Sequence, residues 1–511
     1  MKKNSLIAVN AGAQYARTII NVGLSFYSTR IIFEALGDSN YGIYTLVAGV
    51  VFLLSFVSNA MSTSTQRFLS YHQGNANIRE LRKIFANSML LHYALAASFV
   101  IILEIAGLFI FNGFLNIAPD RIYAAKFTYQ CVILMVIITC LASPFRGLLI
   151  SHQNLIYTSF VDVSDGILKL VIAFIVLRCH FITDSLIEYS LLLITVNLFN
   201  LLAYSLYGRN KYAECRFPKL SLWDSSITKK MVSFTGWIVY STLMIMGRNQ
   251  GTAIIINKFY GTVANAAFGI AAQINSACTF VSGSILNAFY PQIITSEGEG
   301  KSQDALKYAI TSSKLCYLMM LMVVVPLCFY MNQIMEIWLG SVPEYAVPMA
   351  RIVLLTSLSD QITKGLSVIN KAVGKLKVYS LTVDTIKILT LPVLFILLLL
   401  GIDLKIAFSC YFFMEALSAL TRLPIMKKQA GISIKKWVMD VFINLITPTI
   451  LIAVFYFLCY YYLSHSLMTI LLVSIFGCLF LTTTSYFLAM SDSERHTINE
   501  MIKNLVTKIR R

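Results

Sequence analysis

Six basic residues lie inside stretches of this chain that are otherwise hydrophobic enough to sit in a lipid bilayer. A cation at the centre of a membrane helix costs about 2.5 to 3.5 kcal/mol on insertion scales, because lipid does not solvate it. Arginine also presents a planar fork of N–H donors that matches phosphate oxygens. The pattern therefore predicts a cavity for a negatively charged substrate. The residues are Arg17, Arg30, Lys169, Arg248, Arg351 and Lys387.

The first hydrophobic segment carries a polar stripe along one helical face. A lone arginine near a helix end is usually an anchor that reaches the membrane surface, whereas this stripe runs the length of the segment. We therefore predict that Gln14, Arg17 and Asn21 face the cavity and bind the anionic group of the substrate. The stripe consists of Asn10, Gln14, Arg17, Asn21 and Ser28.

Two further arginines are candidate substrate ligands. Arg248 lies near the middle of its segment, with Ser241 and Thr252 on the same helical face, and is the best single candidate. Arg30 lies about 20 Å further along the first segment than Arg17, at a rise of 1.5 Å per residue, which places it near the outer mouth. For Arg30, a binding residue and an interfacial anchor are equal alternatives.

Acidic residues in the same stretches are either partners in structural ion pairs or sites for a coupling ion. Asp162 and Asp165 stand within two turns of Lys169 on one segment. Asp384 stands one turn before Lys387 on another segment. Oppositely charged side chains at these spacings can pair along their own helix, so structural ion pairs are favoured.

Glu104 and Glu415 have no such local partner. A carboxyl group buried without a partner favours its neutral form, so either residue is a candidate carrier of a coupling proton. The ten cysteines and six histidines show no metal-ligand spacing, and no nucleotide-binding or nucleophile motif is present. We expect no enzyme activity, no cofactor and no metal. Transport would be driven by an ion gradient, the membrane potential or the substrate gradient.

The composition indicates an all-α polytopic membrane protein. The 511 residues are 57% hydrophobic and only 13% charged, and the mean hydropathy is +0.72, which is too apolar for an ordinary soluble domain. A net charge of +17 could suggest nucleic acid, but the basic residues are dispersed in short loops rather than gathered on one face. We expect no nucleic-acid partner, and we expect a monomer.

Hydrophobic runs of spanning length recur along the whole chain. Lys and Arg are concentrated in the segments that face the cytoplasm if the N-terminus is inside, so both termini are predicted to be cytoplasmic. Since a spanning helix needs roughly 17 to 25 residues, we predict about fourteen spans. They are 10–33, 41–62, 84–111, 122–144, 155–177, 184–206, 231–257, 263–290, 309–336, 345–363, 378–400, 404–424, 437–463 and 466–490.

The chain repeats itself. The segments that begin at Tyr157 and Tyr379 open with similar residues and reach Asp162 and Asp384. Each segment follows a turn of a basic residue, glycine and leucine, which starts at Arg146 in one case and at Lys364 in the other. Because six helices is an even number, two such lobes start on the same side of the membrane, and the substrate site is expected between them.

The predicted organisation follows from this repeat and from the charge pattern. Ser491 and Glu494 form a capping pattern that opens a basic amphipathic run, which we expect to lie on anionic inner-leaflet lipids. The predicted parts are an N-terminal lobe at 1–206, a cytoplasmic linker at 207–230, a C-terminal lobe at 231–424, two appended helices at 437–490 and the amphipathic segment at 491–511.

A set of residues near the N-terminus carries a family resemblance: Arg30, the turn from Leu36 to Tyr44, Asn59, Arg67-Phe68-Leu69-Ser70 and Gly74. With these residues the chain resembles the Wzx-type polysaccharide-unit flippases of the MATE-like MOP superfamily. The resemblance implies a MATE-like fold of six plus six helices with two extra C-terminal helices, in a bacterial inner membrane. It also implies that the chain moves an undecaprenyl-diphosphate-linked oligosaccharide, such as an O-antigen, capsule or exopolysaccharide precursor, from the cytoplasmic to the periplasmic leaflet by alternating access. Polysaccharide polymerase machinery is an implied partner.

In the related cavities cationic residues bind the diphosphate, a role that the resemblance assigns here to Arg17 and Arg248. Three alternatives stay open. Lipid II-type flippases have fourteen helices, whereas many Wzx-type proteins have twelve. A MATE-type cation-coupled multidrug exporter would need carboxylates where the first segment carries Arg17 and Arg30. A membrane-embedded polysaccharide polymerase or glycosyltransferase would need large outside loops, and the predicted outside loops are short.

Overall fold

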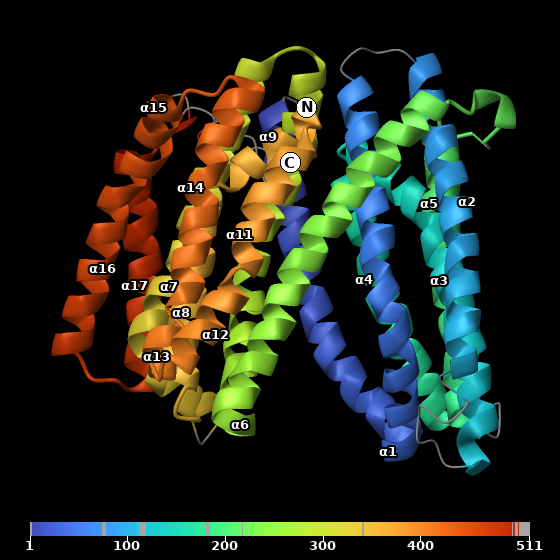
Figure 1. Ribbon diagram of the computed structural model, residues 1–511, viewed down its shortest axis with the longest axis horizontal. Coiled ribbons are helices and arrows are strands. Elements are labelled where there is room, and N and C mark those ends of the chain that lie inside the picture. The colour runs from blue at the N-terminus through green and yellow to red at the C-terminus, as the bar shows by residue number, and fades with distance from the viewer. Residues whose placement is uncertain are drawn as a thin grey trace, which may run out of the picture. The chain divides into compact units, whose positions relative to one another are not determined.

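The computed structural model describes residues 3–73, 78–109, 111, 119–179, 184–216, 218–339, 342–492, 494–495 and 499. Every regular element in these ranges is a helix, which confirms the predicted all-α class (Figure 1). Among them, nine helices are long and apolar enough to cross a membrane, or ten if α8 (Ala346–Gln361) and α9 (Lys364–Val373), bent by 49°, form one span.

Two of the long helices are interrupted near their middle by a glycine with a non-helical backbone. Gly37 in α1 (Lys3–Gln73) has φ 72° and ψ 169°, and Gly261 in α6 (Ser225–Gly298) has φ 73° and ψ −168°. Only glycine adopts this backbone conformation without strain. Each long helix therefore has two arms and supplies two of the predicted spans. The second arm of α1, both arms of α6 and the charged helix α4 are helical where spans are predicted but fall outside the nine.

The residues divide into two compact units, which are described separately. Unit 2 is Gly12–Val239. Within it, α3 packs against α2 and α5, and α4 packs against α5, as Figure 1 shows for α2, α3 and α5. Val47, Leu103 and Tyr129 belong to one buried cluster of its core. Besides α1, its main helices are α2 (Ile78–Phe109), α3 (Ile122–Ser151), α4 (Leu155–Arg178) and α5 (Ser185–Lys211).

Unit 1 is Met1–Ala11 together with Tyr240–Arg511. In it, α7 packs on α8, while α14 packs on α8, α9, α11 and α12. A π-helical turn at Ser380–Asp384 joins two of the short helices. Besides α6, α8 and α9, the helices are α7 (Ser302–Leu339), α10 (Leu376–Tyr379), α11 (Thr385–Ile388), α12 (Thr390–Leu399), α13 (Leu404–Ala407) and α14 (Cys410–Ala430).

The two units share one packing pattern. The contacts of α3 with α2 and α5 correspond to those of α8 with α7 and α14, and the contact of α4 with α5 corresponds to that of α12 with α14. The first arms of α1 and α6 also end at glycines of the same conformation. The division between the units falls inside α6, between Val239 and Tyr240. The residue boundaries given above for the lobes and the linker stay predictions.

A helical hairpin without a counterpart in unit 2 follows α14. It consists of α15 (Ile434–Trp437), a π-helical turn at Val438–Ile443, α16 (Asn444–Tyr462), α17 (Leu467–Thr484) and a further π-helical turn at Ser485–Ala489. Both α16 and α17 pack on α7.

An ion pair and hydrogen bonds join the segment after this hairpin to α7. Lys314, which is buried, donates from Nζ to the carbonyl oxygen of Ala489 at 3.1 Å and to Glu494 Oε2 at 2.9 Å. Thr311 Oγ1 donates to Glu494 Oε1 at 3.0 Å. Within the predicted amphipathic segment 491–511, the structure describes residues 491, 492, 494, 495 and 499, so the predicted surface helix lies largely outside the described residues.

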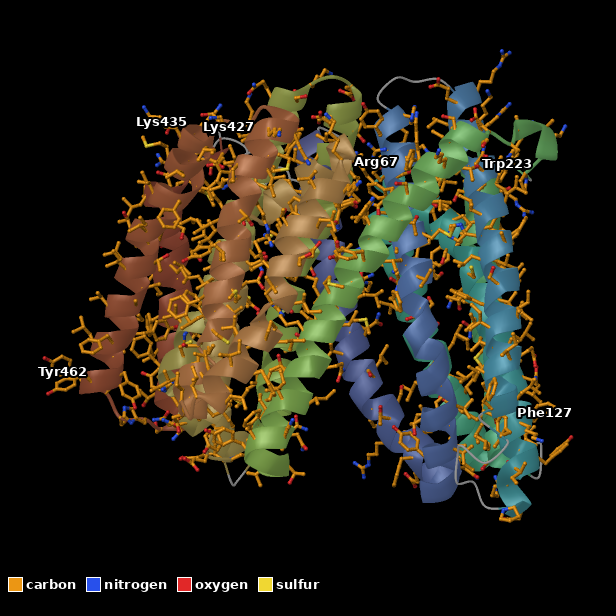
Figure 2. All side chains as sticks on the ribbon, viewed as in Figure 1. Arg67, Phe127, Trp223, Lys427, Lys435 and Tyr462 are labelled. Atoms are coloured by element: carbon orange, nitrogen blue, oxygen red, sulfur yellow. The ribbon has the colours of Figure 1, made fainter. Side chains whose placement is uncertain are left out.

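Figure 2 labels residues at both ends of each unit. In unit 1, Lys427 and Lys435 lie at one end and Tyr462 lies at the other. In unit 2, Arg67 and Trp223 lie at one end and Phe127 lies at the other. The expected enrichment of Lys and Arg on one side of the membrane stays a prediction. The side itself, and the location of both termini, stay predictions.

Candidate functional site

In unit 2, two arginines converge on one carboxylate oxygen. Arg17 NH1, from the first arm of α1, lies 2.6 Å from Asp162 Oδ2, and Arg146 NH2, from α3, lies 2.9 Å from the same oxygen. Asp162 stands on α4, so three helices meet at this point. The exposed fractions of the side chains are 21% for Arg17, 39% for Arg146 and 20% for Asp162. We call these three residues the arginine pair site.

Neighbouring polar groups hold this site in place. Tyr204 donates its hydroxyl to Asp162 Oδ1 at 2.8 Å, and Asn21 Nδ2 donates to the carbonyl oxygen of Asp162 at 3.3 Å. One turn earlier on α1, Gln14 Nε2 donates to Ser159 Oγ at 3.3 Å. The polar stripe of α1 is therefore a contact with α4. Gln14 is buried in that contact, whereas Arg17 keeps part of its surface.

The arginine pair site carries more positive than negative charge. Two guanidinium groups face a single carboxylate, and the next charged pair along α4 is balanced, since Lys169 Nζ lies 2.8 Å from Asp165 Oδ2. Asn200 donates to the other oxygen of Asp165 at 2.7 Å. Each guanidinium has five N–H donors, of which the carboxylate takes few. The site can therefore accept a further anion.

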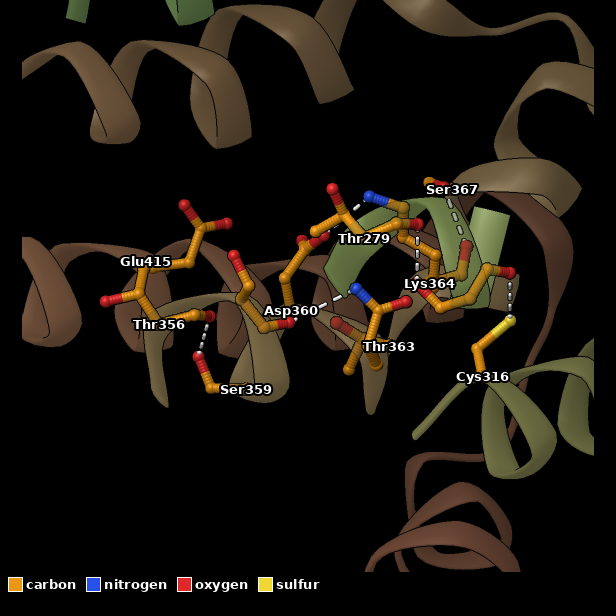
Figure 3. A network of polar contacts seen from close by, with 12 residues as sticks. Thr279, Cys316, Thr356, Ser359, Asp360, Thr363, Lys364, Ser367 and Glu415 are labelled. Carbon is orange, nitrogen blue, oxygen red and sulfur yellow. Dashed lines mark hydrogen bonds and ion pairs between the residues drawn. The ribbon is translucent and has the colours of Figure 1, made fainter. Parts of the chain in front are cut away.

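Unit 1 holds its charges in a buried network around two carboxylates. Glu415 receives Arg248 NH1 at 2.6 Å on one oxygen and Lys387 Nζ at 2.5 Å on the other. Asp360 receives Arg422 NH2 at 2.5 Å. Figure 3 shows Asp360 between Glu415 and Lys364, whose Nζ lies 2.5 Å from Asp360 Oδ2. We call these six residues, Arg248, Asp360, Lys364, Lys387, Glu415 and Arg422, the buried charge network.

Burial makes this network a structural element. The exposed fraction is 10% for the Arg248 side chain and 3% for Glu415, and the Arg248 guanidinium also lies 4.5 Å from the centre of the Tyr411 ring. Opposite charges offset one another in a low-dielectric interior, but removal of one partner leaves a buried charge that costs about 3 to 5 kcal/mol. Arg248 is thus held between Glu415 and Tyr411, and a diphosphate-binding role for it stays a prediction.

Two pairings expected from the sequence are corrected by the structure. Lys387 binds Glu415 rather than Asp384, and Asp384 Oδ2 instead accepts from Ser241 Oγ at 2.5 Å. Asp162 pairs with arginines of other helices rather than with Lys169. The reason is the same in each case, because a partner on a packed neighbouring helix reaches the carboxylate more directly than a side chain on its own helix.

Neither of the acidic residues predicted to lack a partner stands alone. Glu415 has partners on α6 and α11. Glu104 on α2 accepts from Gln130 Nε2 on α3 at 3.3 Å. Arg351 is also held in place, since its Nε donates to the carbonyl oxygen of Cys328 at 2.8 Å.

Four charged residues of these clusters are not among the site residues predicted from the sequence: Arg146, Asp360, Lys364 and Arg422. Arg146 was assigned to a cytoplasmic turn, but it lies within α3. The signal that could have revealed it was the repeat itself, which sets Arg146 beside Lys364, and both of these residues bind a carboxylate. No group of His, Cys, Asp and Glu suited to a metal ion is found among the described residues.

Outside the membrane segments, contacts with His152 and Asn87 hold the chain between α5 and α6 against other parts of unit 2. His152 Nε2 lies 2.5 Å from Glu214 Oε1, and the His152 ring stacks on Tyr212 with the ring centres 3.9 Å apart. Burial, the largest single cause, raises the pKa of Glu214. The hydrogen bond with His152, a backbone hydrogen bond and the charges of His152 and Arg82 together outweigh it, so the pKa lies below its ordinary value. Further along, Asn87 Oδ1 accepts from the backbone N–H of Asp224 at 2.9 Å.

Comparison with known proteins identifies the fold. No family model and no curated protein matches the sequence. Solved structures do match, among them the MATE transporter ClbM in complex with Rb⁺, with a TM-score of 0.70, 15% identity, and coverage of 86% of this chain and 97% of that one. A MATE protein in the straight conformation matches with a TM-score of 0.70 at 11% identity, covering 84% of this chain and 97% of that one. The chain has the fold of MATE transporters.

A third similar structure is a MOP superfamily transporter from Pyrococcus furiosus, whose binding pocket is described as having reversed polarity that suggests a different function. It matches with a TM-score of 0.68 at 11% identity, and covers 84% of this chain and 98% of its own. These structures are covered almost completely, while part of the present chain is left over. The match confirms the predicted MATE-like fold.

Proposed function

We propose that this protein is a membrane transporter that flips an oligosaccharide linked to a lipid through a diphosphate, by alternating access between the two faces of the inner membrane. The observation that carries the proposal is the arginine pair site. Two partly exposed guanidinium groups share one carboxylate there and retain a net positive charge. A diphosphate that enters a low-dielectric interior needs such compensating cations.

The geometry suggests what each residue does. Asp162 fixes the positions of Arg17 and Arg146, so that their remaining N–H donors are ordered before the substrate arrives. Preorganised donors bind a charged group more strongly, because less side-chain freedom is lost on binding. We place the diphosphate at Arg17 and Arg146 in preference to Arg248, since burial covers Arg248 and Tyr411 lies against its guanidinium.

The wider setting of the proposal follows the resemblance to Wzx-type flippases. The lipid would be undecaprenyl diphosphate, and the cargo would be a repeat unit that polymerase machinery joins after transport. The protein would act as a transporter without enzyme activity, in a bacterial inner membrane, with both termini in the cytoplasm and with its basic C-terminal segment on anionic lipids. A lipid II-type cargo has the same diphosphate and fits the same site.

A second candidate function is export of cationic drugs, which is favoured by one observation, the fold. One similar structure is described as an outward-facing multidrug resistance MATE transporter, with a TM-score of 0.69 at 12% identity and coverage of 84% of this chain. A cationic substrate needs an available carboxylate. In the two clusters described here, Asp162, Asp360 and Glu415 are all occupied by arginine or lysine, so the charge argues for an anionic cargo.

The experiment measures surface polysaccharide in a strain that lacks its own flippase and expresses this protein. We expect Arg17→Gln and Arg146→Gln each to reduce the polymer strongly at normal protein levels, because a neutral amide cannot compensate the diphosphate. Lys428→Ala, an exposed residue in the last turn of α14, is the control and should be nearly silent. Full polymer from the double variant Arg17→Gln, Arg146→Gln would refute the role of the site. Energy-dependent efflux of cationic dyes without any polymer would instead support drug export.

A further inference from the structure

The first arm of α1 borders a cavity near its outer turn. The cavity has a volume of about 490 Å³ and is lined by Ser25, Thr29, Arg30 and Phe33 from the first arm and by Tyr41 from the second. All five residues belong to unit 2 and flank the Gly37 turn. The volume lies within the range of roughly 300 to 1,000 Å³ found for small-molecule sites. We call this cavity the α1 pocket.

The lining combines three kinds of group. Thr29 Oγ1 donates its hydrogen to the carbonyl oxygen of Ser25 at 2.9 Å, so its lone pairs are left to accept. The rings of Phe33 and Tyr41 meet edge to face, with centres 5.3 Å apart, and form an apolar wall. Among the side chains that the structure describes, none forms an ion pair with Arg30, which is exposed.

These groups together fit an anionic and polyhydroxylated ligand. The Thr29 hydroxyl can accept a hydrogen bond from a sugar hydroxyl, and the Ser25 hydroxyl can donate or accept one. The ring wall can cover the apolar face of a sugar ring. The guanidinium of Arg30 matches a carboxylate, to which it can donate two parallel hydrogen bonds. A pocket with a few well-placed polar groups on an apolar wall is the usual form of a selective small-molecule site.

The distance along α1 sets which part of a cargo this pocket reaches. Arg17 and Arg30 stand on the same unbroken arm, about 20 Å apart at a rise of 1.5 Å per residue. A ligand whose diphosphate is held at Arg17 reaches Arg30 only with sugars remote from the lipid. We propose that the α1 pocket binds an acidic sugar at the distal end of the transported oligosaccharide. This inference rests on the function proposed above. It implies that the protein favours complete repeat units over truncated ones, because only a complete unit reaches from Arg17 to Arg30.

The test uses the full chain in phosphatidylcholine nanodiscs and measures binding of soluble probes by microscale thermophoresis. The probes are tetrasaccharides that end in glucuronate or galacturonate, the same sugars with the carboxylate reduced to a hydroxymethyl group, and inorganic diphosphate. The variants are Arg30→Gln, Arg30→Lys and Arg17→Gln. The matched control is Arg178→Gln, which removes the same charge from another exposed arginine, at the end of α4.

We expect at least one acidic tetrasaccharide to bind about tenfold or more tightly than its reduced form, because a site built for hydrogen bonds to one group rejects the analogue without it. Arg30→Gln should erase this preference, Arg30→Lys should keep part of it, and Arg178→Gln should leave it unchanged. Arg17→Gln should weaken binding of inorganic diphosphate but not of the free tetrasaccharide.

Several results would overturn the proposal. Equal binding of the acidic and reduced sugars, no binding of either acidic probe, or a preference that survives Arg30→Gln would each remove the α1 pocket as a sugar site. A parallel series in nanodiscs that contain phosphatidylglycerol tests a lipid headgroup as the ligand. Enrichment of that lipid that depends on Arg30, without sugar binding, would reassign the pocket. Failure of Arg17→Gln to affect diphosphate binding would contradict the proposed function and leave the sugar result standing.

Discussion

Unit 2 and unit 1 place charges at corresponding points of one packing pattern, but they treat those charges differently. In unit 2, Arg17 reaches Asp162, and both side chains are partly exposed. In unit 1, Ser241 stands as far before Gly261 as Arg17 stands before Gly37, and it donates to Asp384 as Arg17 does to Asp162. The repeat thus keeps the acid and changes its partner from a cation to a hydroxyl.

The cations of unit 1 belong instead to the buried charge network. There each of the two carboxylates has more than one basic partner, and Arg248 and Glu415 are almost fully enclosed. Both clusters hold more cations than carboxylates, so they differ in burial rather than in the sign of their charge. A buried network mainly fixes helix positions, whereas a partly exposed pair of cations can bind a ligand. The comparison therefore teaches that an arginine inside the membrane is a ligand candidate when part of its guanidinium stays exposed.

The strongest way to break this comparison is to remove one carboxylate from each unit. Glu415→Ala leaves Arg248 and Lys387 without their shared carboxylate in the interior, and should destabilise the protein by about 3 to 5 kcal/mol. Asp162→Ala should cost no more than about 1 kcal/mol, because partly exposed cations can still be solvated. Thermal unfolding of the purified proteins in detergent measures both values.

A control tests the cause of the Glu415 effect. Replacing Glu415, Arg248 and Lys387 together by Leu, Met and Met removes all three charges, and should restore much of the stability lost in Glu415→Ala. If Asp162→Ala lowers the unfolding temperature as much as Glu415→Ala does, the two clusters do not differ in the way described.

The next largest effect is expected at Lys314 of α7 and at Asn87 of α2. Glu494→Ala removes the carboxylate that binds buried Lys314 and should cost about 1 to 3 kcal/mol, because the ammonium group loses its charged partner and keeps the carbonyl oxygen of Ala489. The matched change in unit 2 is Asn87→Ala, which removes hydrogen bonds between neutral groups and should cost about 1 kcal/mol. Denaturation curves in detergent compare the two. An equal cost for both would show that the charge on Lys314 has no special weight.

A smaller effect on stability with a large effect on transport is expected at Arg17. Arg17→Ser gives unit 2 the residue type that unit 1 has at Ser241. Since Arg17 is partly exposed, the unfolding free energy should change by less than about 1 kcal/mol. The transported polymer should nevertheless fall by about tenfold or more, which corresponds to roughly 1.4 kcal/mol of lost interaction. Normal polymer levels with a stable protein would assign Arg17 a purely structural role.

The smallest effect concerns pH and the chain that follows α5. The pKa of Glu214 is lower in the folded state than its ordinary value of 4.5. Its contribution to stability is therefore present above pH 4.5 and is lost as the pH falls through the folded-state value. Wild type should exceed Glu214→Gln in stability by about 1 kcal/mol at pH 6, and this difference should shrink below pH 4.5. A constant difference from pH 6 to pH 3 would contradict the assignment.

Composition and periodicity were enough to predict the helical class and the repeat, because both depend on patterns local to the chain. The spacing of Asp165 and Lys169 is of the same kind, and the two residues do pair. Such local patterns could not predict the arginine pair site or the buried charge network. Arg17 and Asp162 are 145 residues apart, and Arg248 and Glu415 are 167 apart, so their contact depends on which helices pack together. A short-range search therefore left Glu415 without a partner.

The ion pair between Lys314 and Glu494 also has a consequence for biosynthesis. The ribosome makes Glu494 180 residues after Lys314, so at about 5 to 20 residues per second roughly 10 to 40 s separate them. During that interval Glu494 is not yet available to the ammonium group of Lys314 on α7. Unit 1 therefore completes its assembly only when the segment that carries Glu494 docks, and a chain stalled before Glu494 would expose that defect to quality-control proteases.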